Sequence, residues 1–169
     1  GTESITSYYI IPYGQSMGFA TAAAQAFVDY IIYAMLVGYF AGILLIPKYI
    51  SQARALSGCA FLGICFSVGA IFTRGLSSVL FVAAMGFCNA LNWPCIWPLA
   101  LNGVGRFTKT AAAFLIMAIA GDAIFPVLYA QLNTTFGARA GIFLLMILYT
   151  VILLYATTWH KKKAWKRVI

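Results

Sequence analysis

One run of the chain, from Gly75 to Gly105, contains no charged side chain, and this run constrains the fold most. A helix needs about 20 apolar residues to cross a bilayer, so the run is long enough to span one. Its centre nevertheless carries two asparagines, two tryptophans and two prolines. Polar groups in hydrocarbon are costly and normally face a protein interior or a water-filled cavity. We therefore interpret the run as a membrane span that also contacts something polar.

The composition excludes a soluble domain. Hydrophobic residues make up 63% of the chain and charged residues only 8%, whereas a soluble domain carries about 25% charged residues. The chain must therefore be surrounded by lipid, and we expect a single membrane domain. The net charge of +8 does not indicate a nucleic-acid partner, because the basic residues lie between apolar runs rather than along a polar face with interleaved aromatic residues.

Six apolar segments predict an all-α membrane bundle with short, antiparallel connections. Continuous apolar runs favour helices over a membrane barrel, whose strands would alternate over about 10 residues. Because the chain does not begin with Met and Gly1 opens within a helix, we expect a piece of a longer protein with a truncated first helix. The predicted segments are 1–12, 26–47, 55–72, 76–101, 110–132 and 138–159.

The basic residues predict the orientation. With helices alternating in direction, nine Lys and Arg residues lie on one side of the membrane, and only Arg74 and Arg139 lie on the other. Positive residues collect on the cytoplasmic side, so the basic tail at 160–169 is expected to be cytoplasmic. This tail either only orients the protein or also recognises anionic lipid. The nine are Lys48, Arg54, Arg106, Lys109, Lys161, Lys162, Lys163, Lys166 and Arg167.

Polar and aromatic residues share one face of the fourth predicted helix. Asn89, Asn92 and Trp93 are three or four residues apart, which is the spacing of neighbours on a helix surface. An amide donates and accepts hydrogen bonds at once, and an indole adds a flat apolar face. Together they suit a sugar, which has hydroxyl edges and apolar C–H faces. In the alternative interpretation, the two amides hydrogen-bond a neighbouring helix.

The same helix contains Pro94 and Pro98. Each proline lacks a backbone donor and crowds the preceding turn, so we predict a kinked or locally loosened helix with spare carbonyl groups near the membrane centre. Interrupted helices of this kind line the binding sites of many transporters. Proline is also simply more frequent in membrane helices than in soluble ones.

Of the three acidic residues, Asp29 lies at the outer entrance of the second predicted span, where water is available, and the other two lie deeper within their spans. Asp122 lies near the middle of the fifth segment, and Glu3 lies roughly 13 Å inside the outer end of the first, at 1.5 Å per residue. An intramembrane carboxylate is a functional hypothesis by default. We therefore consider both residues as proton carriers and Glu3 as a hydrogen-bond partner of the solute. The alternative for Asp122 is an acid that bridges helices through a Tyr or Asn.

No residue pattern indicates an enzyme, a metal site or a cofactor. The only histidine is His160, in the tail, and no Ser/His pair or metal-ligand spacing occurs within the spans. The four cysteines lie within apolar runs without a C-x-x-C spacing, which is typical of small buried side chains. These are Cys59, Cys65, Cys88 and Cys95.

Three segments resemble the fucose/glucose/galactose proton symporter family of the major facilitator superfamily, closest to its glucose/galactose branch. Residues 86–105 (GFCNALNWPCIWPLALNGVG) resemble the tenth helix of that family. Residues 107–121 (FTKTAAAFLIMAIAG) resemble its eleventh helix and entry loop, and Gly1-Thr-Glu3 resembles a Gly-Ala-Glu step in its seventh. The likeness extends over nearly the whole chain.

The resemblance implies a twelve-helix fold of two six-helix halves, of which this chain is the C-terminal half. It also implies alternating access and sugar uptake coupled to protons. Asn89 and Pro94 match an Asn and a Pro of the family, and Glu3 matches a position that is acidic or amide. Two positions depart from the family pattern: Tyr39 stands where an Arg is usual, and Asp122 where a second Gly is usual.

We therefore predict the C-terminal half of a bacterial inner-membrane symporter for a hexose, either glucose, galactose or fucose. Its partners would be the sugar, a proton, the lipid bilayer and a missing N-terminal half. The alternative is a non-transporting membrane protein, either a sugar sensor or an assembly subunit. The symporter interpretation requires the amides of the fourth helix to face a cavity rather than the acyl chains.

Overall fold

The protein is helical throughout the residues that the computed structural model describes, which are 1–46, 48–137 and 139–159. Two short 3₁₀ turns, η1 (Gly105–Phe107) and η2 (Ala118–Ala120), flank α5. The α-helices are α1 (Thr2–Ser16), α2 (Thr21–Leu45), α3 (Gln52–Phe72), α4 (Gly75–Leu101), α5 (Thr108–Met117), α6 (Gly121–Phe136) and α7 (Ala140–Thr157).

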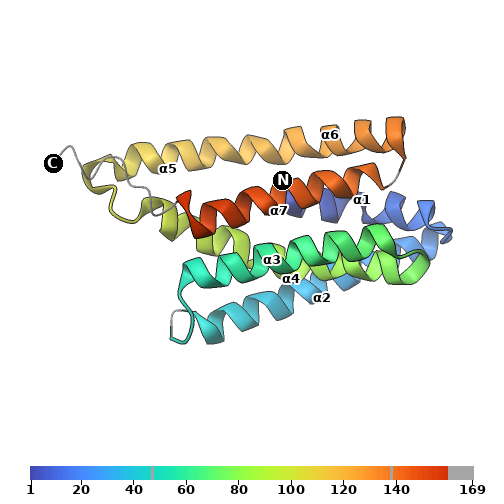
Figure 1. The fold of residues 1–169 in the computed structure, drawn as a ribbon, viewed down its shortest axis with the longest axis horizontal. Coiled ribbons are helices and arrows are strands. Elements are labelled where there is room, and N and C mark those ends of the chain that lie inside the picture. The colour runs from blue at the N-terminus through green and yellow to red at the C-terminus, as the bar shows by residue number, and fades with distance from the viewer. Residues whose placement is uncertain (47, 138, 160–169) are drawn as a thin grey trace.

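Five helical stretches are long and apolar enough to cross a membrane, so the chain is a multi-pass membrane protein. The fourth of these joins η1, α5, η2 and α6 into one span over Gly105–Phe136. Helix α1 is shorter, and it begins about midway along the bundle (Figure 1). The five stretches are Thr21–Leu45, Gln52–Phe72, Gly75–Leu101, Gly105–Phe136 and Ala140–Thr157.

Several helix ends differ from the sequence-based bounds. Helix α1 continues through Pro12 to Ser16, and α2 begins at Thr21, before the predicted start at residue 26. The predicted bounds left Gln15 and Thr21 between two helices. In the structure these residues are helical, and Gln15 Nε2 donates to Thr21 Oγ1 at 3.0 Å across the α1–α2 turn. The basic tail predicted at 160–169 lies outside the described residues.

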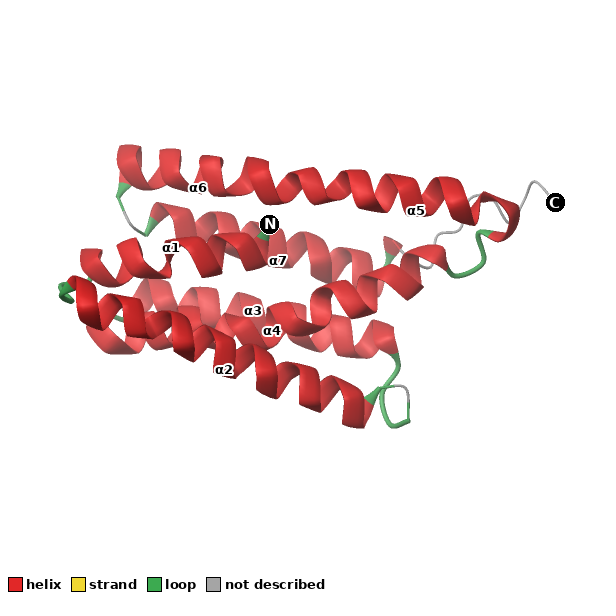
Figure 2. Cartoon of the chain, turned by 180° about the vertical axis from the view of Figure 1, so that it is seen from behind, coloured by secondary structure: helices red, strands yellow, loops and turns green. Residues whose placement is uncertain are grey.

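Helix α4 is the centre of the bundle. It packs between α2 and α3, while α3 packs also against α7, and α1 lies against α2 and α4. The span formed by α5 and α6 runs along the outer edge of the bundle beside α7, as Figures 1 and 2 show. The long apolar helices therefore have very different numbers of helical neighbours.

Small residues allow α2 and α4 to approach closely. A Cβ added to Gly38 would lie 2.7 Å from the carbonyl oxygen of Phe87, and one added to Gly86 would lie 2.7 Å from that of Ile31. Both contacts are with backbone atoms, which cannot move aside. Glycine on each helix therefore sets the distance between the two axes, as it often does where helices pack in membranes.

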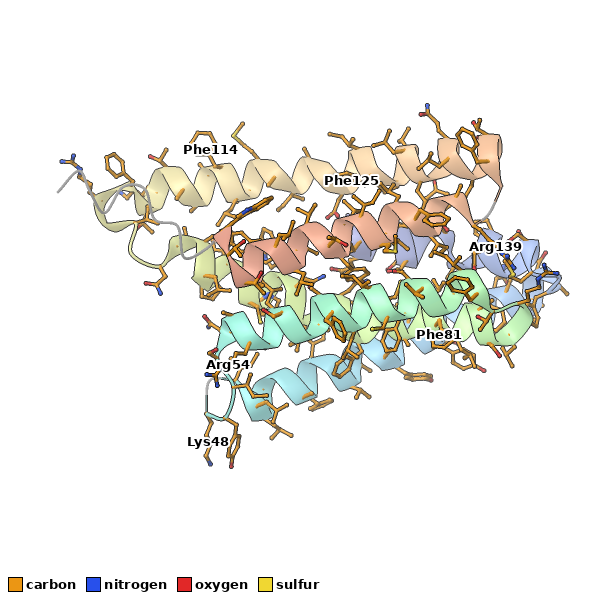
Figure 3. All side chains as sticks on the ribbon, viewed as in Figure 1. Lys48, Arg54, Phe81, Phe114, Phe125 and Arg139 are labelled. Atoms are coloured by element: carbon orange, nitrogen blue, oxygen red, sulfur yellow. The ribbon has the colours of Figure 1, made fainter. Side chains whose placement is uncertain are left out.

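The antiparallel arrangement separates the basic residues. Lys48 and Arg54 lie at the end of the bundle with the α2–α3 turn, and Arg139 lies at the opposite end (Figure 3). This separation agrees with alternating helix directions, which underlie the predicted orientation.

Candidate functional site: a polar cavity beside helix α4

A cavity of about 500 Å³ opens between α1, α4, α6 and α7. Its volume falls in the range of about 300–1,000 Å³ that is typical of small-molecule sites. It includes the first residues of α1 and therefore lies about midway along the bundle (Figure 1). Most of its wall is apolar. The polar side chains in the wall are Thr2, Glu3, Asn92 and Asp122, and the aromatic ones are Trp93 and Phe125.

Asn92 contributes a buried amide to this wall, with 9% of its surface exposed. Its Nδ2 donates to Asn89 Oδ1 at 3.3 Å and to Thr2 Oγ1 at 3.4 Å. Its Oδ1 is buried and has no hydrogen-bond partner among the described residues. An unsatisfied buried acceptor is costly, and a rotation of the Asn92 amide that turned Oδ1 towards the cavity would offer it to a solute hydroxyl.

Asn89 has different surroundings from Asn92, although the two residues share a helix face. It is 2% exposed and is absent from the cavity wall. Its Nδ2 donates to Thr6 Oγ1 at 3.0 Å, and its Oδ1 accepts from the Tyr149 hydroxyl at 2.8 Å. The amide therefore joins α4 to α1 and α7. The helix-bridging alternative describes these contacts of Asn89, and Thr2, Thr6 and Tyr149 are partners that the sequence patterns did not identify.

Tyr149 reaches Asn89 because α3 carries a glycine where the two helices meet. Tyr149 is fully buried, and a Cβ added to Gly63 would lie 2.5 Å from its ring. Any side chain at position 63 would displace the ring and its hydroxyl from Asn89. The orientation of the Asn89 amide, and through it that of Asn92, therefore depends on a glycine of α3 that acts through Tyr149 of α7.

Trp93 borders the cavity and is 43% exposed. Its ring lies 5.5 Å from that of Trp97, at an angle of 52°. Both rings also line a shallow hollow together with Pro94 and Pro98. Helix α4 remains one continuous helix through these prolines, and the end that carries them leads towards α5 (Figure 2). The predicted kink stays a prediction.

Both predicted intramembrane acids line the cavity. The Asp122 carboxylate lies against Gly1 at the start of α1, so α1 and α6 contact each other at this point. The Glu3 side chain is exposed at the cavity, whereas Thr6, one turn further on, points into the bundle. The structure therefore brings Glu3, Asn92, Trp93 and Asp122 together and leaves Asn89 behind them.

The third acid, Asp29, is exposed on α2 and does not line the cavity. Because α2 begins at Thr21, Asp29 lies two turns inside the helix rather than at its entrance. Within the described part of the chain, no group of three His, Cys, Asp or Glu side chains has the geometry of a metal site. Three of the four cysteines are buried thiols, at positions 59, 88 and 95.

These features define a multi-pass helical membrane protein with a polar cavity between its helices. The amides of α4 point into the bundle, and its large exposed side chains are apolar, as lipid requires.

Comparison with known proteins identifies the relatives. The chain is 30% identical over 138 residues to the glucose/galactose transporters of two Brucella abortus strains, which is 82% of this chain and 33% of each relative. It is 26% identical over 126 residues to a putative glucose/galactose transporter of Helicobacter pylori, which is 75% of this chain and 31% of the relative. No family model and no solved structure matches.

The chain is therefore a distant homologue of glucose/galactose transporters over most of its length, and it spans about a third of the length of these relatives. Its homologues are transporters, not enzymes.

Proposed function

We propose that this chain forms the C-terminal half of a hexose–proton symporter of a bacterial inner membrane. The observation that carries the proposal is the cavity beside α4, in which scarce polar side chains gather within an otherwise apolar wall. The homology to transporters named for glucose and galactose supports a sugar as the solute. The C-terminus would be cytoplasmic, and the two halves would rock about the cavity to give alternating access.

The sugar would contact Asn92, Trp93 and Glu3. The unpartnered Oδ1 of Asn92, which is buried, would turn towards the cavity and accept from a sugar hydroxyl. Glu3 would accept from another hydroxyl, and the Trp93 ring would lie against the C–H face of the sugar. Asn89 would act on the sugar through Asn92, because its own amide is held by Thr6 and Tyr149. Pro94 and Pro98 would loosen α4 next to Trp93.

Asp122 and Glu3 would couple the sugar to a proton. Both carboxylates line one cavity, and like charges in a shared site of low dielectric disfavour double ionisation. A single proton held between them would be released when the cavity opens to the cytoplasm. The coupling thus needs no acid outside this chain, although acids in the other half could contribute.

Proteoliposomes that hold the protein together with its proposed N-terminal half would test this function. We expect Asp122→Asn to abolish accumulation of labelled glucose or galactose driven by a pH gradient, while exchange of sugar between the two sides continues. Asp29→Asn is the matched control, since Asp29 is exposed on α2 outside the cavity, and it should leave both activities unchanged. Unchanged accumulation in Asp122→Asn would remove that residue from coupling.

The sugar contact has its own test. Asn92→Ala should raise the sugar concentration for half-maximal exchange by about tenfold, the size expected when a polar partner inside a binding site is lost. Replacing the pH gradient by a sodium gradient distinguishes the coupling ion. Binding of sugar with no flux in either direction would favour the sensor or assembly subunit instead.

A further inference from the structure

A second cavity lies at the end of the bundle that carries the α2–α3 turn. It has a volume of about 180 Å³, lies between α2, α3 and α4, and shares no lining residue with the polar cavity. Its walls are apolar apart from one side chain, Arg54. The apolar walls include Leu45, Ile46, Ile50, Leu62, Phe87 and Leu91.

Arg54 has no acidic partner. It lies in the first turn of α3 and is exposed, and the one ion pair among the described residues joins Gly1 to Asp122. The three acids of the chain are on α1, in the first half of α2 and on α6. Lys48 lies at the same end of the bundle (Figure 3). This end is therefore positively charged, and the Arg54 guanidinium is available to an anionic group from the membrane.

Gly58 leaves the cavity open one turn deeper along α3. It is four residues after Arg54, so the two positions share one helix face, and both line the cavity. A Cβ added to Gly58 would meet nothing within 4 Å. The opposite wall is closed, because a Cβ added to Gly42 would collide with Leu91. The Arg54 guanidinium thus lies at the mouth of the cavity, and an open apolar slot extends from it along α3 beside Gly58.

We propose that this second cavity binds an anionic glycerophospholipid. One acyl chain would lie in the slot beside Gly58, and the phosphate would accept hydrogen bonds from the Arg54 guanidinium, whose planar donors match phosphate oxygens in pairs. The membrane supplies both parts of this ligand in one molecule. Basic pockets between membrane helices are suited to anionic headgroups. Here the apolar slot would also require that the ligand carry an acyl chain.

Native mass spectrometry of the purified protein can count retained lipid. The protein is exchanged from vesicles of phosphatidylglycerol or of phosphatidylcholine with identical acyl chains. We expect about tenfold more retained phosphatidylglycerol, and Arg54→Gln should reduce it to the level of phosphatidylcholine. Arg54→Lys, which keeps the charge but loses the paired donors, should be intermediate. Arg139→Gln removes the same charge at the opposite end and should change nothing.

Gly58→Leu tests the slot independently of the charge. The leucine side chain would enter open space, so the thermal stability of this variant should be preserved, and retention of both lipids should fall. Gly58→Ala should have a smaller effect in the same direction. Equal losses of phosphatidylglycerol in Arg54→Gln and Arg139→Gln would overturn the proposal in favour of general charge attraction. Unchanged retention in a folded Gly58→Leu variant would overturn it as well.

Discussion

Helix α4 and the span formed by α5, η2 and α6 are both long enough to cross a membrane, but the bundle uses them differently. In the most apolar window of α4, 56% of the residues are buried within the protein, against 6% in the corresponding window of Gly105–Phe136. Helix α4 packs between α2 and α3, with α1 alongside. The α5–α6 span touches mainly α1 and α7 and exposes large side chains such as Phe114 (Figure 3).

The more apolar of the two spans is the less buried one. In water this would be a contradiction, but lipid solvates an apolar side chain as well as a protein interior does. What brings a helix to the centre of this bundle is instead its small and polar residues, such as Gly86 and Asn89. We therefore expect substitutions on α4 and its neighbours to affect stability far more than substitutions on α5 and α6.

The largest contrast should come from glycine. Gly38→Val would place side-chain atoms against the carbonyl oxygen of Phe87, 2.7 Å from the added Cβ, and force α2 away from α4. We expect the free energy of unfolding to fall by about 3 kcal/mol, the upper end of the range for overpacking, or the variant not to fold. In Gly121→Ala the new Cβ meets only the Phe125 ring, at 3.2 Å, and stability should barely change. Thermal melting in detergent compares the two, and equal losses would contradict the contrast.

Substitutions of the two amides of α4 should differ in their stability loss by less than the two glycine substitutions do. Asn89→Leu removes the partner of both Thr6 and the buried Tyr149 hydroxyl, which should cost about 1–3 kcal/mol. Asn92→Leu removes an amide whose Oδ1 already has no partner, so its stability loss should be smaller while its effect on sugar exchange is larger. If Asn92→Leu is the more destabilising of the pair, the division between a bridging and a cavity amide is wrong.

A single hydroxyl gives a finer measurement. Tyr149→Phe keeps the ring against Gly63 but removes the donor to Asn89 Oδ1, and we expect a loss of about 0.5–1.5 kcal/mol. Tyr33→Phe is the control, because Tyr33 is exposed on α2. Melting temperatures of the two variants should therefore differ, and an unchanged melting temperature in Tyr149→Phe would show that the bond to Asn89 contributes nothing.

The smallest effect should be found on α6. Thr134 Oγ1 donates to the carbonyl oxygen of Gln131 in its own helix, at 2.9 Å, on an exposed surface. Thr134→Ala should therefore change the stability by no more than about 0.5 kcal/mol. Thr6→Ala, which removes the acceptor of Asn89 Nδ2, should cost more in the same melting assay. A larger loss in Thr134→Ala would indicate that the α5–α6 span is held more firmly than its contacts suggest.

Continuous apolar runs and short connections predicted the helical membrane fold, because both features are local in the sequence. The site was only partly predictable. The spacing of Asn89, Asn92 and Trp93 placed them on one helix face, but it could not tell which amide meets another helix, since that depends on Thr6 and Tyr149, which are distant in the sequence. The 3₁₀ turn within the fifth predicted helix had no distinctive residue pattern, because Ala118–Ala120 are ordinary helix formers.

That turn has a geometric consequence for the Asp122 carboxylate. A residue advances about 120° around the axis in a 3₁₀-helix and about 100° in an α-helix, so the three residues of η2 add roughly 60° to the rotation between α5 and α6. If Ala118–Ala120 became α-helical, α6 would rotate about its axis relative to α5, and Asp122 would point in a different direction. The face on which that acid emerges is thus set by the pitch of three apolar residues, none of which carries a polar side chain.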